Sequence, residues 1–247
     1  MDYIASLSYG KDSCTIPHVC FDVLNLPLTK LVTVDVMYSE NISADYPEVE
    51  EFKLKTDELF KSRYGLVVEH IKADKTYIEQ FYTIKKKSKN KQNQIYGFPY
   101  TLGAWCNGRL KLDVINKYKN NSQFWYIGYA LDEKNPKRQE KIKNCINLNM
   151  YPLVKAQYTE QMCFDYVKKN GLLNPSYNNS YRDGCWFCHN QRIEVLKELR
   201  NNYPDKWQML LNLEQDSPVS FKPNVTLKQL EQRFIQEDMH LNLCDFI

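Results

Sequence analysis

The sequence lacks the long apolar run that a membrane-spanning helix needs. No segment approaches the roughly 18 consecutive apolar residues of a membrane span, and the N-terminal residues lack the basic and apolar regions of a signal peptide. An excess of one charge sign is also missing, because 33 Lys and Arg residues nearly balance 30 Asp and Glu residues. The formal net charge of +3 does not by itself indicate a nucleic-acid binder, although it permits a local basic patch. We therefore expect a globular, cytoplasmic protein with no membrane partner.

A disulfide framework is not expected either, although the chain has eight cysteines. In a protein without a secretion signal, free thiols or metal ligands are the more common use of cysteine. Three cysteines fall within helical patterns and are expected to be small buried hydrophobic residues, namely Cys14, Cys20 and Cys163. Cys106, Cys185 and Cys188 do not fit that description.

The segment Ser8-Tyr-Gly-Lys-Asp-Ser13 is the first candidate for a binding site. Residues 4–7 can form a strand, Gly10 allows a tight turn, and the apolar residues from 16 to 23 have helical spacing. A loop between a strand and a helix points backbone N–H groups at an anion, while Lys11 adds a mobile charge and the serines add hydroxyls. The segment lacks the four-residue spacer of a Walker A loop. An ordinary turn between a strand and a helix is the alternative.

Strand and helix patterns alternate along the first part of the chain. Residues 30–38 and 66–71 are predicted to be buried strands, and a predicted helix begins near Pro47 and stops at Gly65. Together with residues 4–7, this order predicts an α/β fold with a doubly wound, mostly parallel sheet. Its ligand site should lie at the carboxyl ends of the strands.

The second part of the chain becomes helical. Residues 123–130 form a predicted fourth strand that contains Gly128, where backbone is expected to approach a ligand. Helices are predicted over 193–201, 204–214 and 226–237, the last with a Thr226/Gln229 capping box. We therefore predict an α/β domain over residues 1–180, and a Cys-x-x-Cys segment with a C-terminal helical appendage over residues 181–247.

Five lysines gather in residues 83–94, where the apolar periodicity is lost. Such a run is predicted to be an exposed segment that faces water, and a flap that contacts the phosphate groups of a ligand is the alternative. Lys111 and Arg138 are further candidates for phosphate contacts.

Two sets of residues resemble known families. The Ser8–Ser13 segment is similar to the S-x-G-K-D-S signature of the PP-loop ATP pyrophosphatases. Tyr151-Pro-Leu, Asn174-Pro-x-Tyr177 and Gly184-Cys-x-x-Cys188 resemble the second half of the phosphoadenylyl-sulfate (PAPS) reductase family, and Asp45–Phe52 resembles its segment after the second strand. The resemblance implies a five-stranded, adenine nucleotide α-hydrolase-like fold.

The resemblance also implies ATP and Mg²⁺ as ligands, with cleavage between the α- and β-phosphates. The residues that would then bind the nucleotide are Ser8, Gly10, Lys11, Asp12, Ser13 and Gly128. Lys11 and Asp12 would be catalytic, and Lys11 and the metal would stabilise charge on the departing pyrophosphate.

In the iron–sulfur branch of the PAPS reductase family, a Cys-Cys pair and a later Cys-x-x-Cys together hold a [4Fe-4S] cluster. Here Cys106 corresponds to that pair, while Cys185 and Cys188 form the Cys-x-x-Cys. The resemblance thus implies a cluster with three cysteine ligands, and Cys145 is a candidate fourth. A structural zinc with Cys145 or His189 is one alternative, and unliganded cysteines are another.

Two departures from the family lead away from sulfate reduction. The intact Ser8–Ser13 segment is similar to that of the ATP-cleaving members, and Cys244 is all that the C-terminus shares with the Glu-Cys-Gly-Leu-His tail of the reductases. The leading hypothesis is an ATP pyrophosphatase-type sulfurtransferase that adenylates an acceptor, with a nucleic acid as a candidate acceptor and a sulfur donor or reductant protein as a candidate partner. The alternatives are a thiol- or cluster-dependent reductase of adenylated sulfate and a non-catalytic nucleotide-binding protein with a structural metal site.

Overall fold

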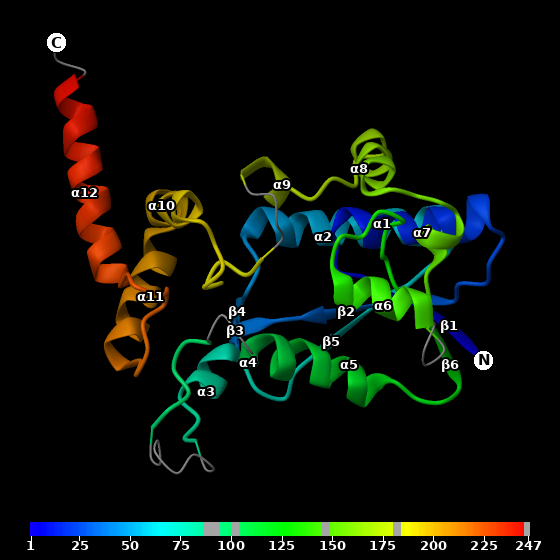
Figure 1. Cartoon of the computed structure of the whole chain (residues 1–247), viewed down its shortest axis with the longest axis horizontal. Helices are drawn as coiled ribbons and strands as arrows, with labels where there is room; N and C mark the ends of the chain where they lie inside the picture. Colours follow the sequence, from blue (N-terminus) through cyan, green and yellow to red (C-terminus); the bar gives the residue numbers. More distant parts are fainter. Residues whose placement is uncertain (86–93, 100–103, 145–148, 180–183, 245–247) are drawn as a thin grey trace. The chain divides into compact units, whose positions relative to one another are not determined.

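A computed structural model describes residues 1–85, 94–99, 104–144, 149–179 and 184–244 of the chain, whose course is drawn in Figure 1. The chain divides into two compact units. Unit 1 comprises Met1–Asp35, Asp45–Lys72 and Asp113–Asp183. Unit 2 comprises Val36–Ala44, Ala73–Leu112 and Gly184–Ile247. Two segments from the first 180 residues therefore group with the C-terminal helices.

Unit 1 is built on a five-stranded sheet in which every neighbouring pair of strands is parallel. Its strands are β1 (Asp2–Ser6), β2 (Lys30–Asp35), β5 (Val68–Lys72), β6 (Gln123–Tyr126) and β7 (Asn149–Met150). Their order is β5-β2-β1-β6-β7. The order reverses between β1 and β6, and in open α/β sheets ligands bind beyond the carboxyl ends of strands at such a point. The predicted α/β fold with a parallel five-stranded sheet is confirmed.

The helices of unit 1 follow the predicted alternation. They are α1 (Lys11–His18), the π-helical turn η1 (Val19–Val23), α2 (Pro47–Tyr64), α5 (Asp113–Tyr118), α6 (Pro136–Asn144), α7 (Pro152–Lys155), α8 (Glu160–Lys169) and α9 (Ser176–Asn179). Helix α2 begins at Pro47 and ends at Gly65, where a φ of +67° suits glycine. Pro17 has no N–H for the helical ladder, and η1 follows α1 directly.

The two faces of the sheet carry separate hydrophobic clusters. Ala5 of β1 pairs in register with Leu31 of β2, and both belong to the cluster that includes residues of α1, α2 and α8. The intervening residues Ile4, Val32 and Trp125 form a cluster with residues of α5. Helix α5 lies on the opposite side of the sheet from α1 and α2 (Figure 1). Helices therefore cover both faces, as a doubly wound sheet requires.

The strand predicted over residues 30–38 is in fact two strands. Strand β2 ends at Asp35, and β3 (Met37–Ser39) pairs with β4 (Ile42–Ser43) in an antiparallel two-stranded sheet of unit 2. The prediction was wrong at this end because a continuous apolar run does not mark where the chain leaves one sheet for another.

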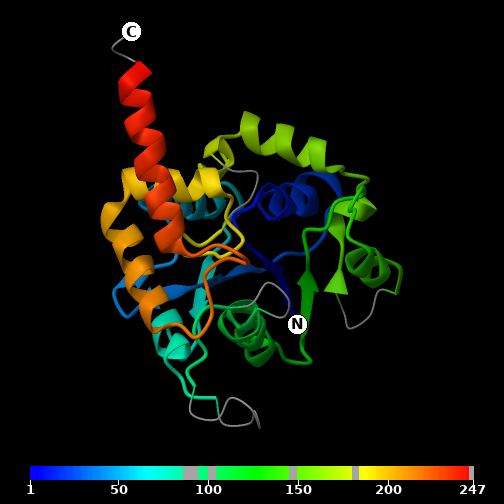
Figure 2. The same ribbon diagram turned by 60° about the vertical axis from the view of Figure 1, so that its left-hand side comes forward.

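Unit 2 consists of this small sheet and of helices. They are α3 (Tyr77–Phe81), α4 (Trp105–Asn107), the π-helical turn η2 (Gly108–Leu112), α10 (Ile193–Asn202), α11 (Pro204–Asp216) and α12 (Leu227–Cys244). The last three are the predicted C-terminal helices, drawn yellow to red in Figure 2. Thr226 and Gln229 form the predicted capping box, with backbone-to-side-chain bonds of 2.8 and 3.1 Å. Among the described residues, no helix is long and apolar enough to cross a membrane.

Replacing Leu31 by alanine should destabilise unit 1 by about 2–5 kcal/mol, the range for Leu→Ala at buried sites. Leu31 is fully buried in the interior strand β2, so the truncation leaves a cavity. The change is measured as the free energy of unfolding in urea, followed by fluorescence. Val67→Ala is the control, because Val67 is 61% exposed and its truncation should cost less than about 0.5 kcal/mol. Equal losses in the two variants would contradict this description of the core.

Candidate functional site

The candidate site is centred on the loop between β1 and α1. Strand β1 ends at Ser6, the loop passes through Tyr9 in the left-handed conformation (φ +58°), and Gly10 caps the N-terminus of α1. The buried Asn174 donates a hydrogen bond to the Tyr9 carbonyl oxygen at 3.2 Å. The predicted order of strand, loop and helix is therefore present, and Asn174 holds the loop at its strained residue.

Hydrogen bonds of the serine hydroxyls link the beginning of the loop to the first turn of α1. The Ser13 hydroxyl accepts a hydrogen bond from the Ser8 backbone N–H at 3.1 Å and donates one to the Gly10 carbonyl at 3.0 Å. The two serine hydroxyls are 3.2 Å apart. The Tyr177 hydroxyl accepts from the Lys11 backbone N–H at 3.4 Å, which is a weak contact.

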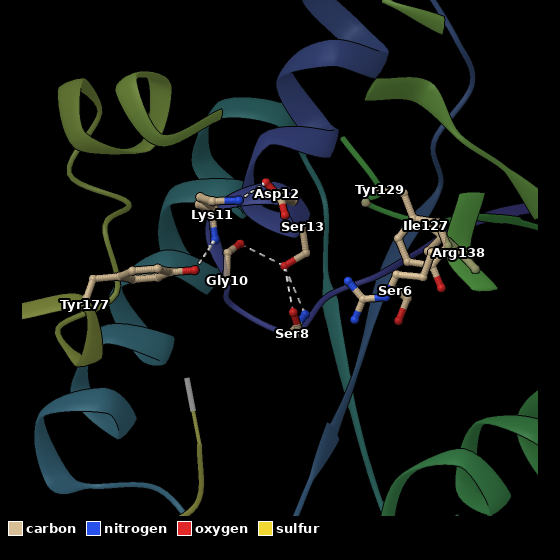
Figure 3. A pocket seen from close by; sticks show the side chains of 11 residues that line it. Ser6, Ser8, Gly10, Lys11, Asp12, Ser13, Ile127, Tyr129, Arg138 and Tyr177 are labelled. Carbon is tan, nitrogen blue, oxygen red and sulfur yellow. Dashed lines mark hydrogen bonds and ion pairs between the residues drawn. The ribbon is translucent and has the colours of Figure 1, made fainter. Parts of the chain in front are cut away.

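These residues line a cavity of about 260 Å³ in unit 1, shown in Figure 3. Its lining residues are Ser6, Ser8, Gly10, Lys11, Asp12, Ser13, Ile127, Gly128, Tyr129, Arg138 and Tyr177. The six residues predicted to bind a nucleotide are all among them, and so is Arg138. In Figure 3, Tyr177 approaches the loop from one side and the Arg138 side chain lies on the other.

The two charged residues of the loop are paired with each other. The Lys11 ammonium lies 2.7 Å from the Asp12 carboxylate and 3.7 Å from Glu160. Burial opposes the charge on Lys11, yet the hydrogen bond to Asp12 and the charges of Asp12 and Glu160 together outweigh it, so the pKa of Lys11 is raised and the side chain stays a cation. Burial raises the pKa of Asp12, and the bond to Lys11 offsets part of that rise. An anion entering the cavity would therefore compete with Asp12 for Lys11.

Gly128 occupies a position where a side chain would crowd the backbone of the neighbouring loop. A Cβ atom there would lie 3.0 Å from the Ser13 backbone nitrogen and 3.1 Å from the Asp12 carbonyl carbon. Both are backbone atoms at the start of α1, so they cannot move aside cheaply. The close partner that the structure shows for Gly128 is thus the loop between β1 and α1. The approach of a ligand to Gly128 stays a prediction.

The other basic candidates differ in their positions. The Arg138 guanidinium donates to Glu133 at 2.8 Å and lies 5.2 Å from the centre of the Tyr129 ring. Lys111 lies in η2 of unit 2 and is absent from the lining of this cavity. Of the lysine-rich run, residues 86–93 lie outside the described part of the chain.

A network of charged residues supports the loop from the sheet. The Tyr9 hydroxyl donates to Asp57 of α2 at 2.7 Å. His70 of β5 bridges the carboxylates of Asp57 and Asp35, at 2.9 and 2.7 Å. Lys53 pairs with Asp35 at 3.2 Å and lies 5.1 Å from the centre of the Tyr9 ring. Asp35 is the last residue of β2, so the strand-end rule could have flagged it from sequence.

The three unusual cysteines lie in unit 2, to which Tyr77 also belongs. Cys106 lies in α4, and Cys185 and Cys188 share a turn in which the Cys188 N–H donates to the Cys185 carbonyl at 2.9 Å. Burial raises the pKa of Tyr77 well above its ordinary value, and the charges of the three cysteine sulfurs act in the same direction. Burial also raises the pKa of Cys106, to which the Cys188 charge contributes while the nearby Lys111 ammonium lowers it.

The structure does not bring these cysteines into a finished metal site. Within the described ranges, no group of three or more His, Cys, Asp or Glu side chains is arranged to hold a single metal ion. The candidate fourth ligand Cys145 lies outside the described residues. His189 is 4% exposed, and neither ring nitrogen has a hydrogen-bond partner in the described part of the chain. Burial lowers the pKa of His189, and the Lys222 ammonium adds to that effect.

Comparison with known proteins gives little further information. No protein-family model matches the chain, and no curated protein matches its sequence. Among solved structures, the chain is similar to the U34-tRNA thiolase NcsA from Methanococcus maripaludis with its [4Fe-4S] cluster. The identity is 15% and the TM-score 0.41, with coverage of 87% of this chain and 71% of that chain.

Gly128→Ala should weaken ATP binding about tenfold or more, equivalent to about 1.4 kcal/mol. The added methyl group would push apart Gly128 and the start of α1, which carries the loop that lines the cavity. Calorimetric titration with ATP measures the effect. Gly108→Ala is the control, because a Cβ atom at Gly108 meets nothing within 4 Å. Unchanged affinity in a folded Gly128→Ala variant would refute the assigned role of this close approach.

The network at His70 should make stability depend on pH. Burial lowers the pKa of His70, but its hydrogen bonds with Asp57 and Asp35, together with the charges of these carboxylates, outweigh burial and raise it. The resulting stabilisation is complete below the unfolded value of about 6.5 and is lost as pH rises through the folded pKa. The free energy of unfolding of the wild type minus that of His70→Gln should therefore fall as pH rises from about 6 to about 8. A difference that is constant or rises over this range would show that the imidazolium does not stabilise the network.

Proposed function

We propose that this protein is a PP-loop enzyme that uses ATP to adenylate an acceptor and then transfers sulfur to it. Unit 1 would supply the nucleotide site and the cysteines of unit 2 would hold an iron–sulfur cluster. The observation that carries the proposal is the 260 Å³ cavity, because the Ser8–Ser13 segment lines it together with Gly128 and Arg138.

The chemistry of this cavity suits a polyphosphate. The N-terminus of α1 supplies backbone N–H groups and the positive end of the helix dipole. Lys11 adds a cation, and the hydroxyls of Ser8 and Ser13 add donors that can reorient. Arg138 presents a planar fork of donors, which matches phosphate oxygens better than a point charge does.

Each loop residue has a task in adenylation. The acceptor oxygen forms a bond to the α-phosphorus, and the bond from that phosphorus to the bridging oxygen of pyrophosphate breaks. Lys11 would leave its present partner Asp12 and stabilise the negative charge that grows on the departing pyrophosphate. The freed Asp12 carboxylate is an oxygen ligand of the kind that Mg²⁺ takes alongside phosphate oxygens. Sulfide then bonds to the activated atom of the acceptor, and AMP leaves with the acceptor oxygen.

The cysteines suit an iron–sulfur cluster by the chemistry of their donor set. Thiolates are the ligands that such clusters need, and the three cysteines all contribute to the raised pKa of one buried hydroxyl, that of Tyr77. That hydroxyl has no hydrogen-bond partner among the described residues, so it could donate a hydrogen bond to a sulfur atom of a bound cluster. A bound cluster with three cysteine ligands would supply one iron able to hold sulfide.

A nucleic acid is the acceptor that we favour. The five lysines of residues 83–94 are an electrostatic match for a phosphate backbone. A sulfur donor or reductant protein would be the source of the sulfide. Sulfite formation from an adenylated sulfate would instead identify a reductase.

Two variants should separate the nucleotide site from the sulfur site. In anaerobically purified protein we expect about four iron and four sulfide per chain, and pyrophosphate release from ATP in the presence of an acceptor. Lys11→Ala should weaken ATP binding about tenfold or more and leave the iron content unchanged. Cys185→Ser should remove the iron and leave ATP affinity within about twofold. The measurements are calorimetric titration, a pyrophosphate assay, and iron and sulfide analysis.

These outcomes are independent of each other. Stoichiometric zinc without iron in protein kept free of oxygen would remove the sulfur-transfer part and leave the nucleotide site. Unchanged ATP affinity in Lys11→Ala would remove the nucleotide assignment and leave the cluster.

A further inference from the structure

Tyr77 combines complete burial with an unpaired hydroxyl. It is the first residue of α3, its exposed fraction is 0%, and its hydroxyl has no hydrogen-bond partner in the described part of the chain. A buried hydroxyl without a partner is costly, so native proteins nearly always give it one. An apolar phenylalanine would fit the same place without that cost. The hydroxyl therefore indicates a partner that is not a protein group of the described residues.

The surroundings of Tyr77 narrow the identity of that partner. The rings of Phe187, Trp105 and Tyr38 lie with their centres 4.2, 5.0 and 6.1 Å from the Tyr77 ring. These aromatic rings offer a hydroxyl no strong acceptor. Trp105 directly precedes Cys106, and Phe187 lies in the turn between Cys185 and Cys188, so these ring contacts place Tyr77 beside the segments that carry the three thiols. The charges of the same cysteines contribute to the raised pKa of Tyr77, so sulfur is the acceptor chemistry that this environment offers.

We propose that Tyr77 donates a hydrogen bond to a sulfur of the metal–thiolate centre held by Cys106, Cys185 and Cys188, and thereby raises its reduction potential. This inference rests on the proposed function, in which these cysteines bind an iron–sulfur cluster. Tyr77 is a tuning residue in this role, because it ligates no iron and touches no substrate.

The direction of the effect follows from charge. Reduction adds one negative charge to the cluster and its thiolates, and a hydrogen-bond donor stabilises the more negative state. Aromatic rings around the hydroxyl exclude water and lower the local dielectric, which strengthens the interaction. Removing the donor should therefore make the cluster harder to reduce.

The test compares the reduction midpoint of the wild type with that of Tyr77→Phe, using full-length protein purified without oxygen. The midpoint is measured by redox titration followed by electron paramagnetic resonance and absorbance. Iron and sulfide contents should be equal in the two proteins. The midpoint of Tyr77→Phe should be more negative by about 59 mV, which corresponds to a tenfold change in the equilibrium constant of a one-electron couple.

Tyr38→Phe is the matched control. Tyr38 is also buried, and its ring lies 4.7 Å from that of Trp186 and 6.1 Å from that of Tyr77. Its own hydroxyl is influenced by burial and by Tyr82. Removing this hydroxyl alters the same aromatic cluster without removing the Tyr77 donor, so the midpoint should stay at the wild-type value.

The outcomes separate this inference from the function on which it rests. Absence of iron from the wild type would refute the proposed cluster. Iron in all three proteins with one common midpoint would refute the role of Tyr77 alone, and so would equal shifts in both variants. Loss of iron from Tyr77→Phe but not from Tyr38→Phe, with unchanged circular dichroism, would support the hydrogen bond as part of what retains the cluster. Loss from both would indicate an effect of packing and overturn the inference.

Discussion

The left-handed conformation of Tyr9 is the constraint on which unit 1 depends. A non-glycine residue at φ +58° is strained by about 1–3 kcal/mol, and it persists when its surroundings hold it from several sides. Here Asn174 binds the Tyr9 carbonyl oxygen, and Asp57 accepts from its hydroxyl. The side chain is 1% exposed, so it also contributes to the core between the sheet and its helices. Because both ends of the residue are fixed, the loop that follows is fixed, and its N–H groups and hydroxyls line the cavity without rearrangement.

Strand order explains why segments that are distant in the sequence meet at the site. Asn174 and Tyr177 belong to one turn, and that turn contacts the loop at the Tyr9 carbonyl and at the Lys11 N–H. Gly128 comes from the exit of β6 and packs directly on the backbone of Asp12 and Ser13. The carboxyl ends of β1 and β6 are neighbours because these strands pair in parallel, so strand order brings the segments together before any side chain acts. The side chains then fix the distances within the cavity.

The structural features that the sequence predicted correctly are those that depend on residues close together in the chain. The strand, loop and helix around Gly10, the end of α2 at Gly65 and the cap at Thr226 follow from residue types within a few positions of each other. The bridge from Asp35 through His70 to Asp57 could not be predicted in this way, because it joins two strands and a helix whose packing sets the spacing. The left-handed conformation of Tyr9 could not be predicted for a related reason. A bulky residue disfavours positive φ, and it adopts that conformation only where tertiary contacts hold it.

The two candidate sites place opposite demands on their surroundings. A site for phosphates needs hard donors, a cation and access for water and substrate, and the cavity at the Ser8–Ser13 segment provides serine hydroxyls, Lys11 and Arg138. A site for sulfur chemistry needs soft ligands, which Cys106, Cys185 and Cys188 would provide as half-buried thiols. Aromatic rings pack beside them around the fully buried Tyr77. The residues of the two sets belong to different units, so each environment can be optimised without disturbing the other. In the phosphate site Lys11 already has a partner in Asp12, whereas in the sulfur site the Tyr77 hydroxyl has none among the described residues. In the proposed function, Lys11 would therefore exchange one partner for another, whereas the Tyr77 hydroxyl would gain a partner that the described residues do not supply.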